Sequence, residues 1–206
     1  MLEAVQSDGS AFLVHLGDIV SGGREGEWLA WRELMADFTL PFFPVPGNHD
    51  SPDGLLDEYL RYSGAPAQRY SFDAGPVHLI MLDSYSGALF DSTLQWLEED
   101  LASTDQPIKM LFFHHPPFDP DGTYHILQMG NEAVMKLAEK HGVQYVFTAH
   151  IHAYVEAERN GVRYIITGGC GAPLHVREHP EGAFYHYVRV HVDGTDVNTE
   201  VVRIEP

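Results

Sequence analysis

Short runs of apolar, β-branched or aromatic residues alternate along this chain with longer amphipathic segments. Such runs predict β-strands, and amphipathic segments whose apolar residues recur every three or four positions predict helices. Because strands and helices that alternate form sheets covered by helices, the pattern predicts a layered α/β or α+β fold. The expected strands span residues 11–16, 41–45, 69–73, 77–83, 108–114, 145–149, 162–167, 184–192 and 196–204, and the expected helices span residues 25–38, 54–62, 92–102 and 131–142.

The size and composition of the chain favour one domain. A chain of 206 residues with 44% hydrophobic content can bury one sizeable core but would be short for two. No stretch resembles a linker, a repeat or a low-complexity segment, so we predict a single domain over residues 1–206.

The chain is strongly acidic. Thirty acidic residues against twelve basic residues give a formal net charge of −18. This charge repels nucleic acids and anionic membrane surfaces, so neither is expected as a partner. No apolar run is long enough to cross a bilayer, which predicts a soluble chain, and the single Cys170 excludes an intrachain disulfide. The oligomeric state stays open, as does the choice between a cytoplasmic and an exported location.

Residues of the types that bind metals follow four of the predicted strands. In sheets flanked by helices, ligands bind outside the carboxyl ends of the strands, so these side chains can converge on one crevice. A set of carboxylate, amide and imidazole groups suits manganese, iron or zinc better than calcium or magnesium alone. The residues are Asp18 after residues 11–16, Asn48 and His49 after residues 41–45, His114 and His115 at the end of residues 108–114, and His150 and His152 after residues 145–149.

Each of these residues also has a purely structural interpretation. Asp18 alone could cap a turn after its strand, and the other three groups are what favour a ligand. His114 and His115 are adjacent, so on a strand end they should point in opposite directions and only one should bind a metal. His15 and His78 lie inside apolar runs and are predicted to be structural.

Four motifs in this order resemble the calcineurin-like metallophosphoesterase family: "GDIVSGG" at residues 17–23, "GNHD" at 47–50, "HHPP" at 114–117 and "AHIH" at 149–152. The resemblance is to its bacterial phosphohydrolase and purple-acid-phosphatase-like branch. It implies an α/β fold, a four-layer αββα sandwich of two mixed β-sheets flanked by helices. It also implies hydrolysis of a phosphomonoester or phosphodiester by a hydroxide that bridges two divalent transition metal ions (Mn, Fe or Zn).

The resemblance assigns metal ligands position by position. It makes Asp18 the carboxylate shared by both metals, with Asn48, His114 and His150 completing the shell of the second metal. His152 would belong to the first metal. Two such cations acidify a bridging water and clamp the phosphate for in-line attack.

The resemblance also assigns residues beside the metals. His49 would stand unligated and either stabilise the developing charge or protonate the leaving alkoxide. Asp50 would either orient His49 or cap the following turn. His115 and His175 are predicted to contact the substrate, His175 from the loop that "TGGCGAPLH" opens.

The chain departs from the family pattern at its beginning. The family opens with a strand ending in Asp-x-His well before the "GD", and only seventeen residues precede Asp18 here. Residues 1–10 are expected to form the tail of a helix and a turn, with Asp8 in that turn. We therefore expect a domain that is incomplete at its N-terminus and lacks its first strand. Such a chain would hold one metal well and hydrolyse esters poorly, or would serve as a catalytically impaired scaffold or interaction module.

Two smaller departures concern single residues. Ser21 stands where the purple branch has a tyrosine ligand, so that chromophore is not expected. Ala149 replaces the usual glycine before His150, which is acceptable if the local backbone avoids positive φ.

Overall fold

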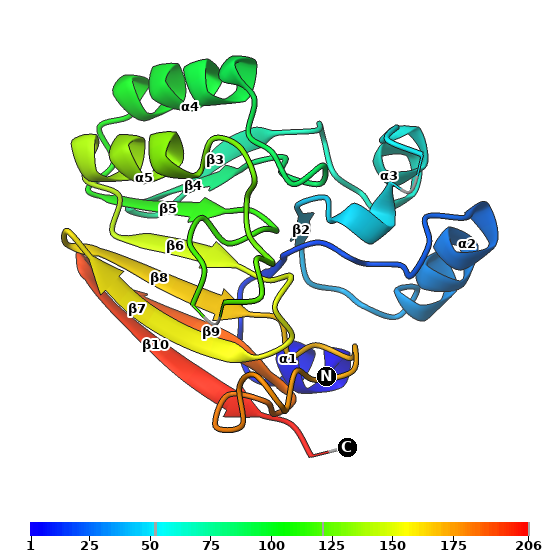
Figure 1. Cartoon of the computed structure of the whole chain (residues 1–206). Helices are drawn as coiled ribbons and strands as arrows, with labels where there is room; N and C mark the ends of the chain where they lie inside the picture. Colours follow the sequence, from blue (N-terminus) through cyan, green and yellow to red (C-terminus); the bar gives the residue numbers. More distant parts are fainter. Residues whose placement is uncertain (52, 121, 206) are drawn as a thin grey trace.

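A mixed sheet of six strands forms the centre of the molecule in the computed structural model, which describes residues 1–51, 53–120 and 122–205 (Figure 1). The strand order is β3-β4-β5-β6-β8-β7, with β4, β5, β6 and β8 parallel and the two edge strands antiparallel to their neighbours. Every residue of β4 is buried, as expected for a strand covered on both faces. These strands span Tyr70–Ala74 (β3), Val77–Met81 (β4), Ile108–Phe112 (β5), Tyr145–Thr148 (β6), Tyr154–Arg159 (β7) and Val162–Thr167 (β8).

Two helices, α4 and α5, cover one face of this sheet (Figure 1). Leu97 of α4 and Val134 of α5 are buried in one cluster with Ile80 and Val146 of the sheet. The apolar stripe of each helix therefore forms the core that its sequence spacing predicts. The helices span Leu2–Ser7 (α1), Glu25–Leu34 (α2), Asp57–Tyr62 (α3), Asp91–Ser103 (α4) and Asn131–Lys140 (α5), and a 3₁₀ turn spans Asn48–Asp50.

A second β layer packs on the other face of the sheet. It consists of two separate pairs, the parallel strands β1 and β2 and the antiparallel hairpin of β9 and β10. Val14 of β1 and Val190 of β9 pack into one cluster with Leu79, Met110 and Phe112 of the six-stranded sheet. The strands span Leu13–His15 (β1), Phe42–Pro44 (β2), His186–Asp193 (β9) and Asp196–Arg203 (β10).

Helices α2 and α3 form an outer layer beside β1 and β2. Trp28 of α2 and Tyr59 of α3 are fully buried, with ring centroids 6.1 Å apart, and the ring of Trp31 lies 5.5 Å from that of Phe42 of β2 in a tilted arrangement. The predicted α/β fold class is confirmed, with the difference that the second sheet is divided into two pairs. No helix within the described ranges combines the length and the apolarity needed to cross a membrane.

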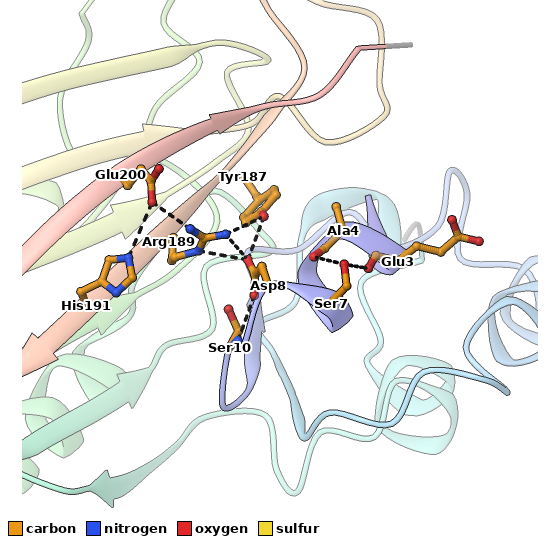
Figure 2. Close-up of polar contacts among 9 residues, drawn as sticks. All are labelled: Glu3, Ala4, Ser7, Asp8, Ser10, Tyr187, Arg189, His191 and Glu200. Carbon is orange, nitrogen blue, oxygen red and sulfur yellow. Dashed lines mark hydrogen bonds and ion pairs between the residues drawn. The ribbon is translucent and has the colours of Figure 1, made fainter.

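Most predicted boundaries shift by one to three residues, and two differences are larger. The sequence pattern does not predict β7, because an edge strand has few apolar residues and exposes its polar ones. Helix α2 ends at Leu34 and not at residue 38, since the chain turns back on itself there, with the N–H of Phe38 donating to Met35. The predicted helix and turn at residues 1–10 are confirmed, and the carboxylate of Asp8 accepts the N–H of Ser10 at 2.9 Å (Figure 2).

Candidate metal centre

The loops that follow β1 and β2 touch backbone to backbone. A Cβ atom at Gly17 would lie 2.6 Å from the backbone nitrogen of Gly47, and one at Gly47 would lie 2.2 Å from Oδ1 of Asp18. Both positions therefore require glycine. Asp18 and His150 have φ angles of 55° and 61°, in the left-handed region where Asp and His are enriched among non-glycine residues. Ala149 lies outside that region, so its methyl group is tolerated as expected.

Four ligand atoms from four different loops meet at His114. Its Nε2 lies 3.1 Å from Oδ1 of Asn48, 3.1 Å from Nδ1 of His150 and 3.2 Å from Oδ2 of Asp18. The Nδ1–H of His114 donates to the carbonyl of Leu16 at 2.7 Å, which leaves the lone pair of a neutral ring on Nε2. One carboxylate, one amide oxygen and two imidazoles form a mixed oxygen and nitrogen donor set that fits a divalent transition metal.

The electrostatics of this group suit a cation. Burial raises the pKa of Asp18, but the hydrogen bond and charge of His114 lower it more, so that the pKa lies well below its ordinary value. Burial and the nearby charge of His114 lower the pKa of His150 to about 2. Burial lowers the pKa of His114, but its hydrogen bond with Asp18 raises it more. A proton and a metal ion therefore compete for Nε2 of His114.

His115 lies beside His114 and not on the opposite side, so the predicted divergence of the two rings is wrong. The alternation rule does not apply because β5 ends at Phe112 and the chain bends at both histidines. The ring of His115 lies 4.8 Å from His114 and 4.1 Å from His150 between centroids. Ligand atoms of these three histidines lie within 4.8 Å of one another, and Nδ1 of His115 is buried without a hydrogen-bond partner in the described structure. His115 is thus a further candidate ligand as well as a candidate substrate contact.

Ser84 holds both histidines in place. Its buried hydroxyl follows β4 and accepts the backbone N–H groups of His114 at 3.0 Å and His115 at 3.1 Å. Ser84 is not among the site residues predicted from the sequence. Its position directly after the strand predicted at residues 77–83 is the signal that could have pointed to it.

We expect Ser84→Ala to lower the free energy of unfolding by about 2–4 kcal/mol, because two buried N–H groups lose their acceptor. Urea unfolding followed by circular dichroism measures this change. Ser86→Ala is the matched control, since Ser86 is exposed two residues further along. Equal unfolding midpoints for the two variants would contradict the assignment.

His49 is exposed at the edge of the centre, and its ring is oriented by a carbonyl group. Its backbone N–H donates to Oδ1 of Asp18 at 2.8 Å, and its ring Nδ1 lies 2.8 Å from the carbonyl oxygen of Ser21. Donation from Nδ1 to Ser21 leaves Nε2 as the ring atom available to a substrate.

Asp50 connects the two loops and does not orient the ring of His49. Its carboxylate accepts the N–H of Gly47 at 2.9 Å and the N–H of Val20 at 3.1 Å, and its side chain is almost fully buried. Burial raises the pKa of Asp50 to about 6, against the effect of these two hydrogen bonds. The orienting role considered for Asp50 belongs to Ser21, and Asp50 instead joins the loop of Asp18 to the loop of Asn48.

A second group of histidines lies beside the candidate metal centre. Nδ1 of His152 lies 2.8 Å from the carbonyl of Pro173, which leaves Nε2 for a ligand, and the ring of His152 is 4.7 Å from His175. His125 lies 5.6 Å from both His150 and His175. His125 is not among the site residues predicted from the sequence, because it lies in the middle of a loop and not after a strand. His152 is therefore placed beside His175, while it lines the same cavity as Asp18 and His114.

This chain is similar in sequence to known hydrolases. A sequence model of the calcineurin-like phosphoesterases matches residues 1–154. The "Probable glycerophosphodiester phosphodiesterase GpdQ" of Arcobacter nitrofigilis is 29% identical over 153 residues, which cover 68% of this chain and 56% of the relative. The "3',5'-cyclic adenosine monophosphate phosphodiesterase CpdA" of Escherichia coli K12 is 28% identical over 177 residues, which cover 81% of this chain and 64% of the relative. The chain thus spans less than two thirds of the length of either relative.

A solved structure shares the fold. The purple acid phosphatase PPD1 from yellow lupin seeds superposes with a TM-score of 0.79 at 19% sequence identity. The match covers 98% of this chain and 46% of the lupin chain. At 19% sequence identity, this similarity shows that the two chains share the layered architecture.

Proposed function

This chain belongs to the calcineurin-like phosphoesterase family, and we propose that it hydrolyses a small phosphate ester with the help of divalent transition metal ions. The observation that carries the proposal is the meeting of Asp18, Asn48 and His150 at Nε2 of His114, with 3.1–3.2 Å between the ligand atoms. A carboxylate, an amide oxygen and imidazoles at one point fit manganese, iron or zinc. Bound ions would supply Lewis-acid polarisation of the phosphoryl group and lower the pKa of water.

Different residues of the chain would bind the two metal ions. Asp18, Asn48, His114 and His150 hold the ion of the more complete site, and His115 adds a further imidazole within reach. Asp18 and His152 line one cavity and would contribute to a second ion. We therefore expect close to one tightly bound equivalent of metal in this chain, since the second ion has fewer protein ligands.

His49 supplies the proton chemistry in this proposal. The carbonyl of Ser21 accepts from Nδ1, so Nε2 lies on the exposed side of the ring, and when a second proton is bound there an Nε2–H group would face a bound ester. From there it donates to the phosphoryl oxygen as charge develops, or to the leaving oxygen as the ester bond breaks. Its exposure lets the ring exchange its proton with solvent between turnovers.

The substrate we propose is a small phosphodiester. The two relatives named above carry phosphodiesterase names, which favours a diester over a monoester. The net charge of −18 opposes binding of nucleic acids and anionic membranes, whereas a small ester needs only the local positive charge of the ions. His115, His125 and His175 lie around the candidate metal centre, and their rings offer N–H donors to the free oxygens of the ester.

The test compares hydrolysis of bis(4-nitrophenyl) phosphate and of 4-nitrophenyl phosphate with Mn²⁺, Fe²⁺ or Zn²⁺ added. We expect metal-dependent turnover that is faster for the diester. A protein that binds metal but hydrolyses neither ester above the level of its His49→Ala variant would contradict the proposal. That result would favour the alternative of a catalytically impaired scaffold.

A further inference from the structure

The loop between β5 and α5 begins at the candidate metal centre and returns to it. It follows the two adjacent histidines at the end of β5, and the N–H of Leu127 donates back to the carbonyl of Pro116 at 2.8 Å. Within this loop the ring of His125 lies 5.6 Å from that of His150, one of the four candidate ligands. The described part of the loop, residues 118–120 and 122–130, therefore includes a segment beside the site where an ester would bind.

Tyr124, the residue before His125, has a backbone conformation that is unfavourable for an aromatic residue. Its φ angle is 61°, in the left-handed region, where a bulky side chain is an outlier. Strain of this kind persists only where the surrounding structure holds it, and it is concentrated at active sites and ligand-binding sites. The conformation of Tyr124 therefore calls for an explanation in terms of what its side chain contacts.

Two side chains hold Tyr124 in this conformation. Oδ2 of Asp119 accepts the N–H of Tyr124 at 3.0 Å, while Oδ1 accepts the N–H of Gly122 at 2.7 Å. Nε2 of Gln128 donates to the carbonyl of Tyr124 at 3.2 Å and to the carbonyl of Ile126 at 3.0 Å. The backbone of Tyr124 is thus fixed at both of its polar groups, although its side chain is 76% exposed. A ring presented in this way has little packing role in the core and is placed to contact a ligand.

The loop after β8 brings a second exposed apolar residue to the same histidines. The ring of His175 lies 5.6 Å from that of His125, and the N–H of His175 donates to the carbonyl of His152 at 3.0 Å. Val176, the next residue, is 60% exposed. Tyr124 and Val176 therefore flank the two neighbouring imidazoles in sequence, one from each loop.

The chemistry of these groups suits a flat aromatic substituent. A tyrosine ring gains from offset stacking or edge-to-face contact with another aromatic ring, beyond the apolar area that the contact buries. The imidazoles of His125 and His175 can in addition donate an N–H to polar atoms at the edge of such a substituent. A short alkyl substituent would cover little of the tyrosine ring and would accept no hydrogen bond.

We propose that Tyr124 is a specificity-determining residue, and that the ester carries an aromatic ring that stacks on Tyr124 beside His125 and His175. This inference rests on the proposed function, because it requires a phosphate group held at the candidate metal centre. It adds the chemical class of the substituent, which the metal ligands do not determine.

The first experiment measures binding without hydrolysis. Benzylphosphonate, cyclohexylmethylphosphonate and methylphosphonate, whose P–C bonds are not ester bonds, are titrated calorimetrically into the chain loaded with Mn²⁺. We expect benzylphosphonate to bind at least about threefold more tightly than cyclohexylmethylphosphonate, which has a similar size but no flat ring, and at least about tenfold more tightly than methylphosphonate. Tyr124→Ala should abolish the preference for benzyl over cyclohexylmethyl, and Tyr124→Phe, which keeps the ring, should retain it.

The second experiment compares benzyl 4-nitrophenyl phosphate with methyl 4-nitrophenyl phosphate, which share one leaving group. Tyr124→Ala should lower kcat/KM by about three- to tenfold for the benzyl ester and leave that of the methyl ester within about twofold. Phe90→Ala is the matched control for both experiments, since it removes another exposed aromatic ring, at the start of α4. Circular dichroism checks that the variants are equally folded.

The two experiments separate this inference from the proposed function. The expected preference among the phosphonates without hydrolysis of either ester would contradict the proposed function and leave the aromatic contact of Tyr124 in place. Hydrolysis of both esters without that preference would overturn the assignment of Tyr124 alone. A preference that survives in Tyr124→Ala, or a chain with bound metal that binds none of the phosphonates, would overturn it as well.

Discussion

Replacing Asp18 by asparagine is expected to weaken metal binding by at least about two orders of magnitude, since even indirect changes around a metal ligand cost 10–100-fold. Asp18 supplies the only anionic ligand atom among the four that meet at His114. Asparagine has nearly the same shape and can still accept the N–H of His49, so the loop keeps its hydrogen bond. The variant therefore removes charge at the centre with little change in packing. Elemental analysis after reconstitution with Mn²⁺ or Zn²⁺, followed by competition with a chelator, measures the effect.

The control for this experiment is Asp37→Asn, which removes an exposed carboxylate away from the centre. It should bind metal as the unchanged chain does. Circular dichroism of both variants establishes that they are equally folded. Unchanged metal content in Asp18→Asn would mean that Asp18 is no ligand, and the assignment of Asn48 and His150 to the same ion would fall with it.

Replacing His49 by alanine is expected to lower kcat by about two to four orders of magnitude while metal content stays the same. The contact between His49 and Asp18 uses the backbone N–H, which alanine retains. The variant removes only the imidazole, whose Nδ1 is held by Ser21 and whose other nitrogen can reach a substrate. The measurement compares kcat and metal content for diesters with good and with poor leaving groups.

The leaving group distinguishes the two roles considered for His49. A proton donor to the leaving oxygen is needed most when that oxygen is basic, so the loss should be larger for an alkyl ester than for a 4-nitrophenyl ester. Stabilisation of the phosphoryl oxygens would give similar losses for both esters. His191→Ala, on the exposed outer side of β9, should leave kcat unchanged. If metal is lost in step with activity, His49 is a ligand.

Local sequence pattern predicts most of the elements and most of the residues of the candidate metal centre. Apolar runs and helical spacing predict the central strands and helices α4 and α5, because burial on one or both faces sets the period of apolar residues. Asp18, Asn48, His114 and His150 could be placed together because each follows a strand and ligands bind outside the carboxyl ends of strands. Only the structure shows that two of them follow β1 and β2 and the other two follow β5 and β6 of a different sheet. The structure brings these four side chains to one point.

Local sequence pattern does not predict contacts between residues that are far apart in the chain. His115 lies beside His150 because the chain bends after Phe112, and at this bend the hydroxyl of Ser84, thirty residues before His114, accepts the backbone N–H groups of both histidines. Asp50 binds the N–H of Val20 and not the ring of His49, although His49 is its neighbour in sequence. His125 lies near His150 but belongs to a loop whose sequence has no periodic pattern of apolar residues. Hydrogen-bond partners of this kind are chosen by the packing of separate loops, which local spacing does not encode.

The division of the second β layer depends on the same physics. The runs at residues 11–16 and 184–192 predict two strands, but nothing in either run states which strand lies beside it. The pairing depends on how β1 and β9 pack on the apolar face of the six-stranded sheet. In that position each edge of β1 and β9 either pairs with another strand or faces the cavity between them. Apolar periodicity records which face of a strand is buried, whereas the neighbour of a strand edge is set by long-range packing.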